Sequence, residues 1–477
     1  MNNFYENTGD RMSFFENAQD AISYRDAYSA ITDDIVELSK LCSNNDHIEP
    51  SLYKEFDVKQ GLRDLNGQGV RAGLTEIGDV HAYNIIEGKQ VPCDGKLYYR
   101  GYDVEKIVQG FPKDVSRGYE EITYLLLFGE LPNKEQMNQF MNILSSYRSL
   151  PNKFTRDVIM KAPSKDLMNG LARSVLMLYS YDDNPDDVTI PNVLRQSLQM
   201  IARFPLLAVY SYQAYRHYHL NKSLIIKQPR EDYSTAENIL WLLRPDGEFS
   251  PLEAKILDIA LVLHAEHGGG NNSTFTTHVV TSSGTDTYSS TVASLGSLKG
   301  PRHGGANLKV TKMFEDLEAH VTDWEDEAAL KDYLNALLEK RAFDQKGLIY
   351  GMGHAVYSIS DPRARVFKSF VEKLSVEKGM QDRFALFDRV ERLSAQLIAE
   401  KRRIYKGVSA NVDFYSGFVY QMLGLPMELF TPIFAIARIS GWSAHRIEEL
   451  VNDGKIIRPA YKNVMPRRDY IAWDDRK

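Results

Sequence analysis

The regular spacing of apolar residues is the feature that most constrains the fold of this chain. From about residue 103 almost to the end, apolar side chains recur three and four positions apart, as at Leu252, Ile256, Ile259 and Leu263. Because an α-helix turns once in 3.6 residues, such side chains share one helical face. The pattern predicts a mainly α-helical protein, and 477 residues are enough for two domains, one larger than the other.

Residues 70–102 follow a different pattern. Short runs of β-branched and aromatic residues are separated there by Gly88 and by the Asp94-Gly95 pair, which is a common turn signal. We expect a small antiparallel β patch in this stretch. The first 60 or so residues have helix-length patterns without recognisable chemistry, and we expect them to form helical packing segments.

Charge and cysteine content exclude several classes of protein. The chain has 57 Lys and Arg against 64 Asp and Glu, so it lacks the basic surplus of a nucleic-acid-binding protein. Its two cysteines, Cys42 and Cys93, argue against a disulfide scaffold and suit a reducing cytosol. The first residues do not resemble a targeting signal, and the apolar runs are shorter than the roughly 18 residues of a membrane span. We expect a cytoplasmic protein with no membrane or nucleic-acid partner.

Glycine and proline interrupt the helical pattern at the places where titratable residues gather. Four such segments, at 265–271, 300–307, 351–357 and 411–417, contain His267, His303, His354 and Asp413. Three arginines complete the set: Arg363, Arg438 and Arg458. Glycine allows backbone and ligand to approach closely, and guanidinium groups bind carboxylates through two hydrogen bonds. Together these residues suit general acid–base chemistry on a small dicarboxylate.

Other interpretations of these segments are weaker. His267 and the three glycines after it resemble the oxyanion element of esterases, but the chain has no G-x-S-x-G nucleophile motif. Residues 351–356 begin like a dinucleotide fingerprint, yet Val356 stands where the third glycine should be. His264, His267 and His278 are a conceivable metal site, but no further ligand or supporting residue can be identified. We expect no metal.

The four segments, in this order, resemble those of the citrate synthase family from about Leu74 to Tyr461. The resemblance implies a helical fold with a large domain from residues 1–304 and 424–477 and a small domain from 305–423. It implies a homodimer that condenses acetyl-CoA with oxaloacetate and water to give citrate and CoA. CoA is then substrate and product, and no cofactor is required.

The resemblance also assigns the catalytic residues. Asp413 matches the carboxylate that removes a methyl proton from acetyl-CoA. His303 matches the imidazole that donates to the thioester oxygen of the resulting enol or enolate, as a neutral ring. His354 matches the residue that polarises and protonates the ketone of oxaloacetate.

The same family pattern assigns the oxaloacetate contacts. Arg363, Arg438 and Arg458 match the residues that bind its two carboxylates, with Arg458 donated by the partner subunit. His267 is expected to add a hydrogen bond. Replacing such an arginine by lysine should remove the two-pronged contact.

The CoA contacts follow the family pattern less closely. Arg100 and Lys406 occupy positions that resemble CoA-binding residues of the family. Ser358 stands four residues after His354, where relatives usually carry Arg or Lys, so the contacts with CoA are expected to differ here. The spacing after Arg458 is also shorter than is usual in the family.

Two rival activities share this family's site. A 2-methylcitrate synthase uses propionyl-CoA, and the extra methylene is worth only about 1–3 kcal/mol in a pocket. A citryl-CoA lyase is less favoured, since the chain has no G-x-x-x-x-G-K-[ST] phosphate-binding loop. A binding protein that lacks activity is disfavoured by the joint presence of Asp413, His303 and His354.

Overall fold

The computed structural model describes residues 29–64, 69–87, 89–112, 116–354, 356–357, 359–402 and 408–476. The chain divides into two compact units. One unit consists of the residues up to Arg71 together with those from Ala460 onward, and the other is Ala72–Pro459.

The smaller unit contains short helices from Asp33 on, as predicted, and residues 1–28 of the predicted helical stretch lie outside the described residues. Its elements are α2 (Asp33–Asn45), α3 (Pro50–Glu55) and the 3₁₀ turns η1 (Gln60–Leu62) and η4 (Trp473–Asp475). Thr32 caps α2 by accepting a hydrogen bond from the backbone of Ile35. None of the residues of α2 or α3 is buried, so these helices contribute little to a core within this unit.

The larger unit is almost entirely helical, which confirms the predicted fold class. Its helices are α4 (Val104–Gly110), α5 (Gly118–Phe128), α6 (Lys134–Tyr147), α7 (Leu167–Tyr179), α8 (Ile190–Leu220), α9 (Thr235–Leu243), α10 (Pro251–His264), α11 (Asn272–Thr281), α12 (Thr287–Lys299), α13 (Ala306–His320), α14 (Glu327–Leu338), α15 (Pro362–Lys378), α16 (Gln381–Arg402), α17 (Val412–Met422) and α18 (Phe430–Val451), with a π-helical turn η2 (Thr155–Met160) and a 3₁₀ turn η3 (Met427–Leu429).

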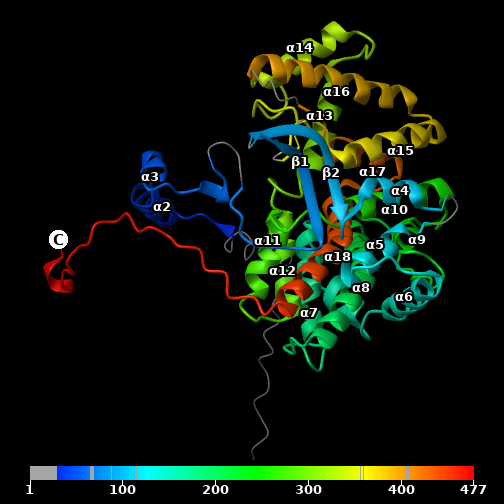
Figure 1. Cartoon of the computed structure of the whole chain (residues 1–477), viewed down its shortest axis with the longest axis horizontal. Helices are drawn as coiled ribbons and strands as arrows, with labels where there is room; N and C mark the ends of the chain where they lie inside the picture. Colours follow the sequence, from blue (N-terminus) through cyan, green and yellow to red (C-terminus); the bar gives the residue numbers. More distant parts are fainter. Residues whose placement is uncertain are drawn as a thin grey trace, which may run out of the picture. The chain divides into compact units, whose positions relative to one another are not determined.

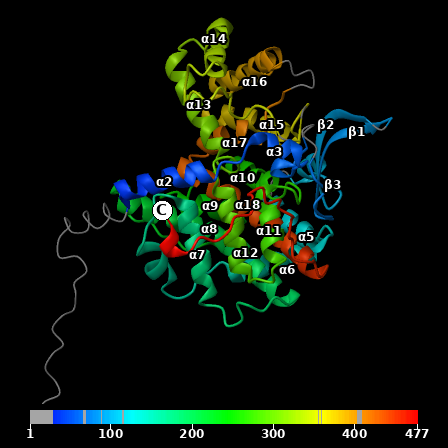
Figure 2. The same cartoon turned by 90° about the vertical axis from the view of Figure 1, so that its left-hand side faces the viewer.

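Helix α18 runs through the middle of this unit. Figures 1 and 2 show it among α5, α8, α10, α11 and α12, and every residue from Phe430 to Arg446 is buried. Helices α13 to α17 gather at one end of the unit in both views. Residues 305–423 correspond closely to this group, but their division from the rest as a separate domain stays a prediction.

The predicted β patch is present as a three-stranded antiparallel sheet. It consists of β1 (Gly78–Ile86), β2 (Lys89–Tyr99) and β3 (Tyr102–Asp103) in the order β1-β2-β3. The Asp94-Gly95 turn was predicted wrongly, because this pair lies inside β2, where the register with β1 shifts. Gly95 is needed for close approach instead: a Cβ there would lie 2.1 Å from the Ser360 carbonyl oxygen.

The predicted breaks coincide with the ends of helices. α10 ends at His264 and α11 begins at Asn272, with the glycine run between them. Asp361 caps α15 with Pro362 as its first residue, and the side chain of Asn411 caps α17. In the described part of the chain, no helix has the length and apolar character that crossing a membrane would require.

Candidate active site

Loops from distant parts of the sequence meet beside α18. His267 follows α10, His303 follows α12, His354 precedes α15, and Asp413 lies in the first turn of α17. The ring of His267 lies beside that of His354, and the charge of Arg438 acts on both His303 and Asp413. The structure therefore brings together the four segments selected from the sequence.

The His354 loop is joined to the start of α17 by backbone hydrogen bonds. The Gly353 N–H donates to the Ser409 carbonyl at 2.7 Å, and the Asn411 N–H donates to the Gly351 carbonyl at 2.8 Å. Gly351 has a φ of 81°, and a Cβ there would lie 2.9 Å from the Cα of Phe414. Only glycine fits this close, left-handed turn. The pairing fixes His354 relative to the helix that carries the carboxylate.

The imidazole of His354 has a defined orientation. Its Nδ1 accepts hydrogen bonds from the backbone N–H groups of Val356 at 3.0 Å and Tyr357 at 3.1 Å. A neutral ring therefore carries its proton on Nε2. The ring also lies 5.3 Å from the ring of His267, measured between centroids. His354 is arranged to donate a proton from Nε2.

Asp413 has the properties of a base that works near neutral pH. Burial raises its pKa to about 6, with Arg363 opposing the shift and Asp361 adding to it. A carboxylate with this pKa is ionised at pH 7 yet binds a proton more readily than an exposed aspartate.

His303 is held by two residues that the sequence analysis missed. The Ser273 backbone N–H donates to Nε2 of His303 at 3.4 Å, and the Ser273 Oγ lies 2.9 Å from the same nitrogen. The indole N–H of Trp442 donates to that Oγ at 3.2 Å. Because Nε2 accepts the backbone hydrogen bond, the neutral ring carries its proton on Nδ1. Burial, with the charge of Arg438, lowers the pKa of His303 to about 4, so the ring is neutral at pH 7.

Arg438 and His267 have buried nitrogens that lack hydrogen-bond partners among the described residues. Arg438 is fully buried and donates from Nε to the His264 carbonyl at 2.6 Å, but its Nη1 and Nη2 have no hydrogen-bond partner among the described residues. The buried Nε2 of His267 likewise has no partner in that part of the chain. Burial and the charge of Arg363, followed by those of His354 and Arg438, lower the pKa of His267. Unpaired buried donors are costly, so this arrangement is typical of a site for an anion.

Arg363 differs from Arg438 because it already has a carboxylate partner. Its Nε and Nη2 bind the Asp361 carboxylate at 3.1 Å and 2.8 Å. Burial alone would lower the pKa of Arg363, but Asp361 raises it above its ordinary value. The Asp361 carboxylate also accepts from the Val412 N–H at 3.2 Å, so this ion pair joins α15 to α17.

Three further predicted contacts are Arg458, Arg100 and Lys406. Arg458 is exposed beyond the end of α18, and its role in a partner's site stays a prediction. Arg100 donates from Nε and Nη2 to the Leu126 carbonyl at 3.2 and 3.0 Å. Lys406 lies outside the described residues, as does Ser358. The CoA-binding roles of Arg100 and Lys406 also stay predictions.

One face of α18 supplies side chains that sequence reasoning largely overlooked. Phe434 lies under the Arg438 guanidinium at 4.7 Å and 4.6 Å from the His264 ring. Trp442 is one turn beyond Arg438 and reaches Ser273. The spacing of four residues between Phe434, Arg438 and Trp442 was the available signal, because it places them on the same helical face.

His264, His267 and His278, which were weighed as a metal site and set aside, do not form a group of ligands among the described residues. Nδ1 of His264 is hydrogen-bonded to the Ala260 carbonyl at 2.8 Å, and the His264 ring packs against Phe434. His278 instead lies beside His445 and Glu448, with ligand-type atoms of all three within 4.8 Å of one another. This group is separate from the acid–base residues.

Comparisons with known proteins agree with this geometry. Residues 64–460 match the family model described as citrate synthase, C-terminal domain. Citrate synthase 2 of Bacillus subtilis is 35% identical over 388 residues, which cover 80% of this chain and 92% of that protein. The 2-methylcitrate synthase of Shewanella oneidensis is 32% identical and covers 78% of this chain and 90% of its own length.

A solved structure shows the same fold with ligands bound. The ternary complex of carboxymethyl coenzyme A and oxaloacetate with citrate synthase from Thermoplasma acidophilum superposes with a TM-score of 0.71 at 26% identity. The match covers 88% of this chain and 99% of that one. Matched over most of its length by the family model, by curated relatives and by solved structures, this chain belongs to the citrate synthase family.

Proposed function

We propose that this protein condenses acetyl-CoA with oxaloacetate and water to give citrate and CoA, at the site formed by His303, His354 and Asp413. The observation that carries the proposal is the fully buried guanidinium group of Arg438, whose Nη1 and Nη2 have no hydrogen-bond partner among the described residues. The proposed base Asp413 and the proposed proton donor His354 belong to the same group of residues. An oxaloacetate carboxylate would satisfy Nη1 and Nη2 together. Oxaloacetate and a CoA analogue bound to the Thermoplasma acidophilum relative support this choice of substrates.

The first step is removal of a methyl proton from acetyl-CoA. Asp413 takes the proton, and the electron pair of the C–H bond moves toward the thioester carbonyl. His303 donates from Nδ1 to the thioester oxygen, where negative charge develops. A neutral imidazole suits this role, and the lowered pKa of His303 keeps the ring neutral.

The second step forms the carbon–carbon bond. The enol or enolate carbon attacks the ketone carbon of oxaloacetate, and His354 gives its Nε2 proton to the ketone oxygen. Water then attacks the citryl thioester and returns a proton to His354, while the proton held by Asp413 passes to the leaving CoA sulfur, so that citrate and the CoA thiol are released. These steps as proposed use side chains and water only, without a cofactor.

The carboxylates of oxaloacetate are proposed to bind Arg438, Arg363 and the partner subunit's Arg458. Arg438 offers two unpaired nitrogens, Nη1 and Nη2, whereas Arg363 is already paired with Asp361, which neutralises part of its positive charge. His267 offers Nε2 to the same ligand. Arg100 and Lys406 are proposed for CoA. A homodimer in the cytosol with the domains 1–304 plus 424–477 and 305–423 completes the proposal.

The experiment is an assay of thiol release from acetyl-CoA with and without oxaloacetate. We expect release only when both are present, with citrate as the product. Release without oxaloacetate, or none with it, would overturn the proposal.

The alternative acyl substrate is propionyl-CoA, which the 2-methylcitrate synthases among the relatives support. The ratio of kcat/KM for the two acyl-CoAs decides between them.

A further inference from the structure

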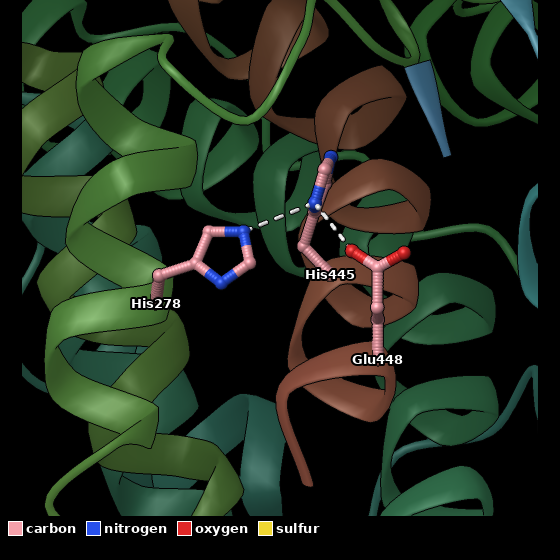
Figure 3. A group of neighbouring side chains, drawn as sticks. All are labelled: His278, His445 and Glu448. Atoms are coloured by element: carbon pink, nitrogen blue, oxygen red, sulfur yellow. Dashed lines mark hydrogen bonds and ion pairs between the residues drawn. The ribbon is translucent and has the colours of Figure 1, made fainter. Parts of the chain in front are cut away.

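A second group of titratable residues lies next to the active site. His278 on α11 faces His445 on α18, with 3.1 Å between Nε2 of His278 and Nδ1 of His445 (Figure 3). An oxygen of Glu448 lies 3.7 Å from the same Nδ1. His445 is fully buried. None of these residues has a role in the proposed reaction.

The outer nitrogen of each histidine faces a carboxylate. Nε2 of His445 lies 3.1 Å from Oε1 of Glu266, and Nδ1 of His278 lies 2.7 Å from Oε2 of Glu449. A nitrogen next to a carboxylate carries a proton. With both outer nitrogens protonated, two neutral rings would direct lone pairs at each other across 3.1 Å. The geometry therefore requires a cation or an extra proton between the rings.

An extra proton on Nδ1 of His445 accounts for the contacts on both sides of its ring. The imidazolium donates from Nδ1 to His278, which donates to Glu449, and its Nε2 forms an ion pair with Glu266 at 3.1 Å without a hydrogen bond. A divalent metal fits less well, since the described cluster holds three possible ligands and no fourth. Glu448 is itself held through Oε1, which accepts from the Glu76 N–H at 2.8 Å, and its Oε2 faces His445. Burial alone would lower the pKa of His445, but Glu266 and Glu448 raise it to about 9.

Glu266 connects this cluster to the substrate site. It directly precedes His267, and its Oε1 also accepts a hydrogen bond from the Gly268 N–H. The carboxylate is tightly enclosed, because a Cβ on Gly78 would lie 2.8 Å from Oε1 and a Cβ on Gly441 would lie 2.6 Å from Oε2. The side chain thus has one position, and the turn that carries His267 is fixed through it.

We infer that His445 is a positioning residue, held as an imidazolium, that locks Glu266 and thereby orients His267 toward oxaloacetate. The inference rests on the proposed function, because it concerns the affinity of that site for its keto acid. The ionisable groups that face His445 are Glu266 from the loop before α11, His278 from α11 and Glu448 from α18. Arg438 acts on the same cluster through Glu266.

The test compares His445→Gln, Glu266→Gln and the double variant. His445→Gln leaves the buried Glu266 charge without its partner, so we expect the KM for oxaloacetate to rise about tenfold while the KM for acetyl-CoA changes less than about twofold. The double variant removes both charges and should recover most of that loss. Recovery in the double variant would also show that the His445→Gln defect is not caused by misfolding, because both substitutions keep a side chain of similar volume.

His278→Gln is the matched control. It replaces the other histidine of the cluster, but its amide oxygen can still accept from His445, so the KM for oxaloacetate should stay within about twofold of the wild-type value. The wild-type KM should rise as the pH passes about 9, and that rise should be absent in His445→Gln.

Three results would overturn the inference. His445→Gln could leave the KM for oxaloacetate unchanged, or raise both KM values together with a lower Tm, which would indicate a merely structural role. Alternatively, one Zn²⁺ per chain, removable by a chelator with loss of activity, would make the cluster a metal site. The wild-type assay is run first, since absence of turnover there refutes the proposed function rather than the role of His445.

Discussion

Asp361 and Arg363 form a two-pronged ion pair at the start of α15, with hydrogen bonds of 3.1 and 2.8 Å. The same carboxylate accepts from the first backbone N–H of α17, directly before Asp413. A single aspartate therefore neutralises an arginine proposed to bind substrate and acts on the proposed base. Its negative charge also helps to raise the pKa of Asp413.

Asp361→Asn should change the pH profile as well as stability. Removing this negative charge lowers the pKa of Asp413, so the acid limb of kcat/KM should move to lower pH by roughly half to one unit. The variant also leaves Arg363 buried without its partner, which should cost about 3 kcal/mol of unfolding free energy. Initial rates between pH 5 and 8 and urea unfolding measure the two effects. An unchanged acid limb would show that Asp361 does not act on the base.

Asp413→Asn should abolish activity and make the protein more stable. The amide cannot accept the methyl proton, so exchange of that proton with solvent should stop while oxaloacetate still binds. The folded pKa of about 6 lies above the usual value near 3.9, so the ionised carboxylate costs stability at every pH above that range. At pH 8 the variant should gain about 1–2 kcal/mol, after allowance for partial exposure. A less stable variant would contradict the desolvation account.

Much of this arrangement was predictable from local sequence. Helical periodicity is a property of neighbouring residues, so the helices could be predicted without knowledge of their partners. The site segments were found because glycine and proline interrupted that periodicity next to His267, His303, His354 and Asp413. Asp94-Gly95 gave a wrong turn prediction because the same pair that suits a turn also suits a close contact between a strand and Ser360.

The supporting contacts could not be predicted, because they join residues far apart in the chain. Ser273 contacts His303, which is 30 positions away in the sequence, and it also contacts Trp442, which is 169 positions away. The pairing of Glu266 with His445 likewise joins the loop between α10 and α11 to α18. The packing of α18 against α11 brings these side chains together, and this packing cannot be predicted from the spacing of neighbouring residues.

Ser273→Ala should slow turnover without weakening oxaloacetate binding. The hydroxyl joins His303 to the indole of Trp442, so its loss leaves the ring held by the backbone hydrogen bond alone. We expect kcat to fall about 10- to 100-fold, because His303 would no longer be aligned with the enolate oxygen. Thr276→Ala on the same helix is the control and should keep the wild-type kcat. Equal effects of the two substitutions would remove Ser273 from the site.

Arg438→Lys should weaken oxaloacetate binding severely. Lysine can place one ammonium group where Arg438 offers Nη1 and Nη2 together, so we expect the KM for oxaloacetate to rise at least about 100-fold. Arg446→Lys is the matched control on the same helix, because Arg446 is buried but already bonded to Thr281, Thr287 and the Thr285 carbonyl. The control should lower the Tm and leave the KM unchanged. Initial rates at varied oxaloacetate concentration give the two KM values, and thermal unfolding gives the Tm of each variant.

The proposed donation of Arg458 to a partner subunit gives the sharpest test of the assembly. Asp413→Asn and Arg458→Gln should each be inactive as homodimers. When the two variants are co-expressed in equal amounts, half of the dimers are mixed, and each mixed dimer has one site with both residues intact if Arg458 crosses the interface. About a quarter of the wild-type activity should then return. If Arg458 serves its own subunit, every site in the mixed dimer carries one defect, and the mixture stays inactive.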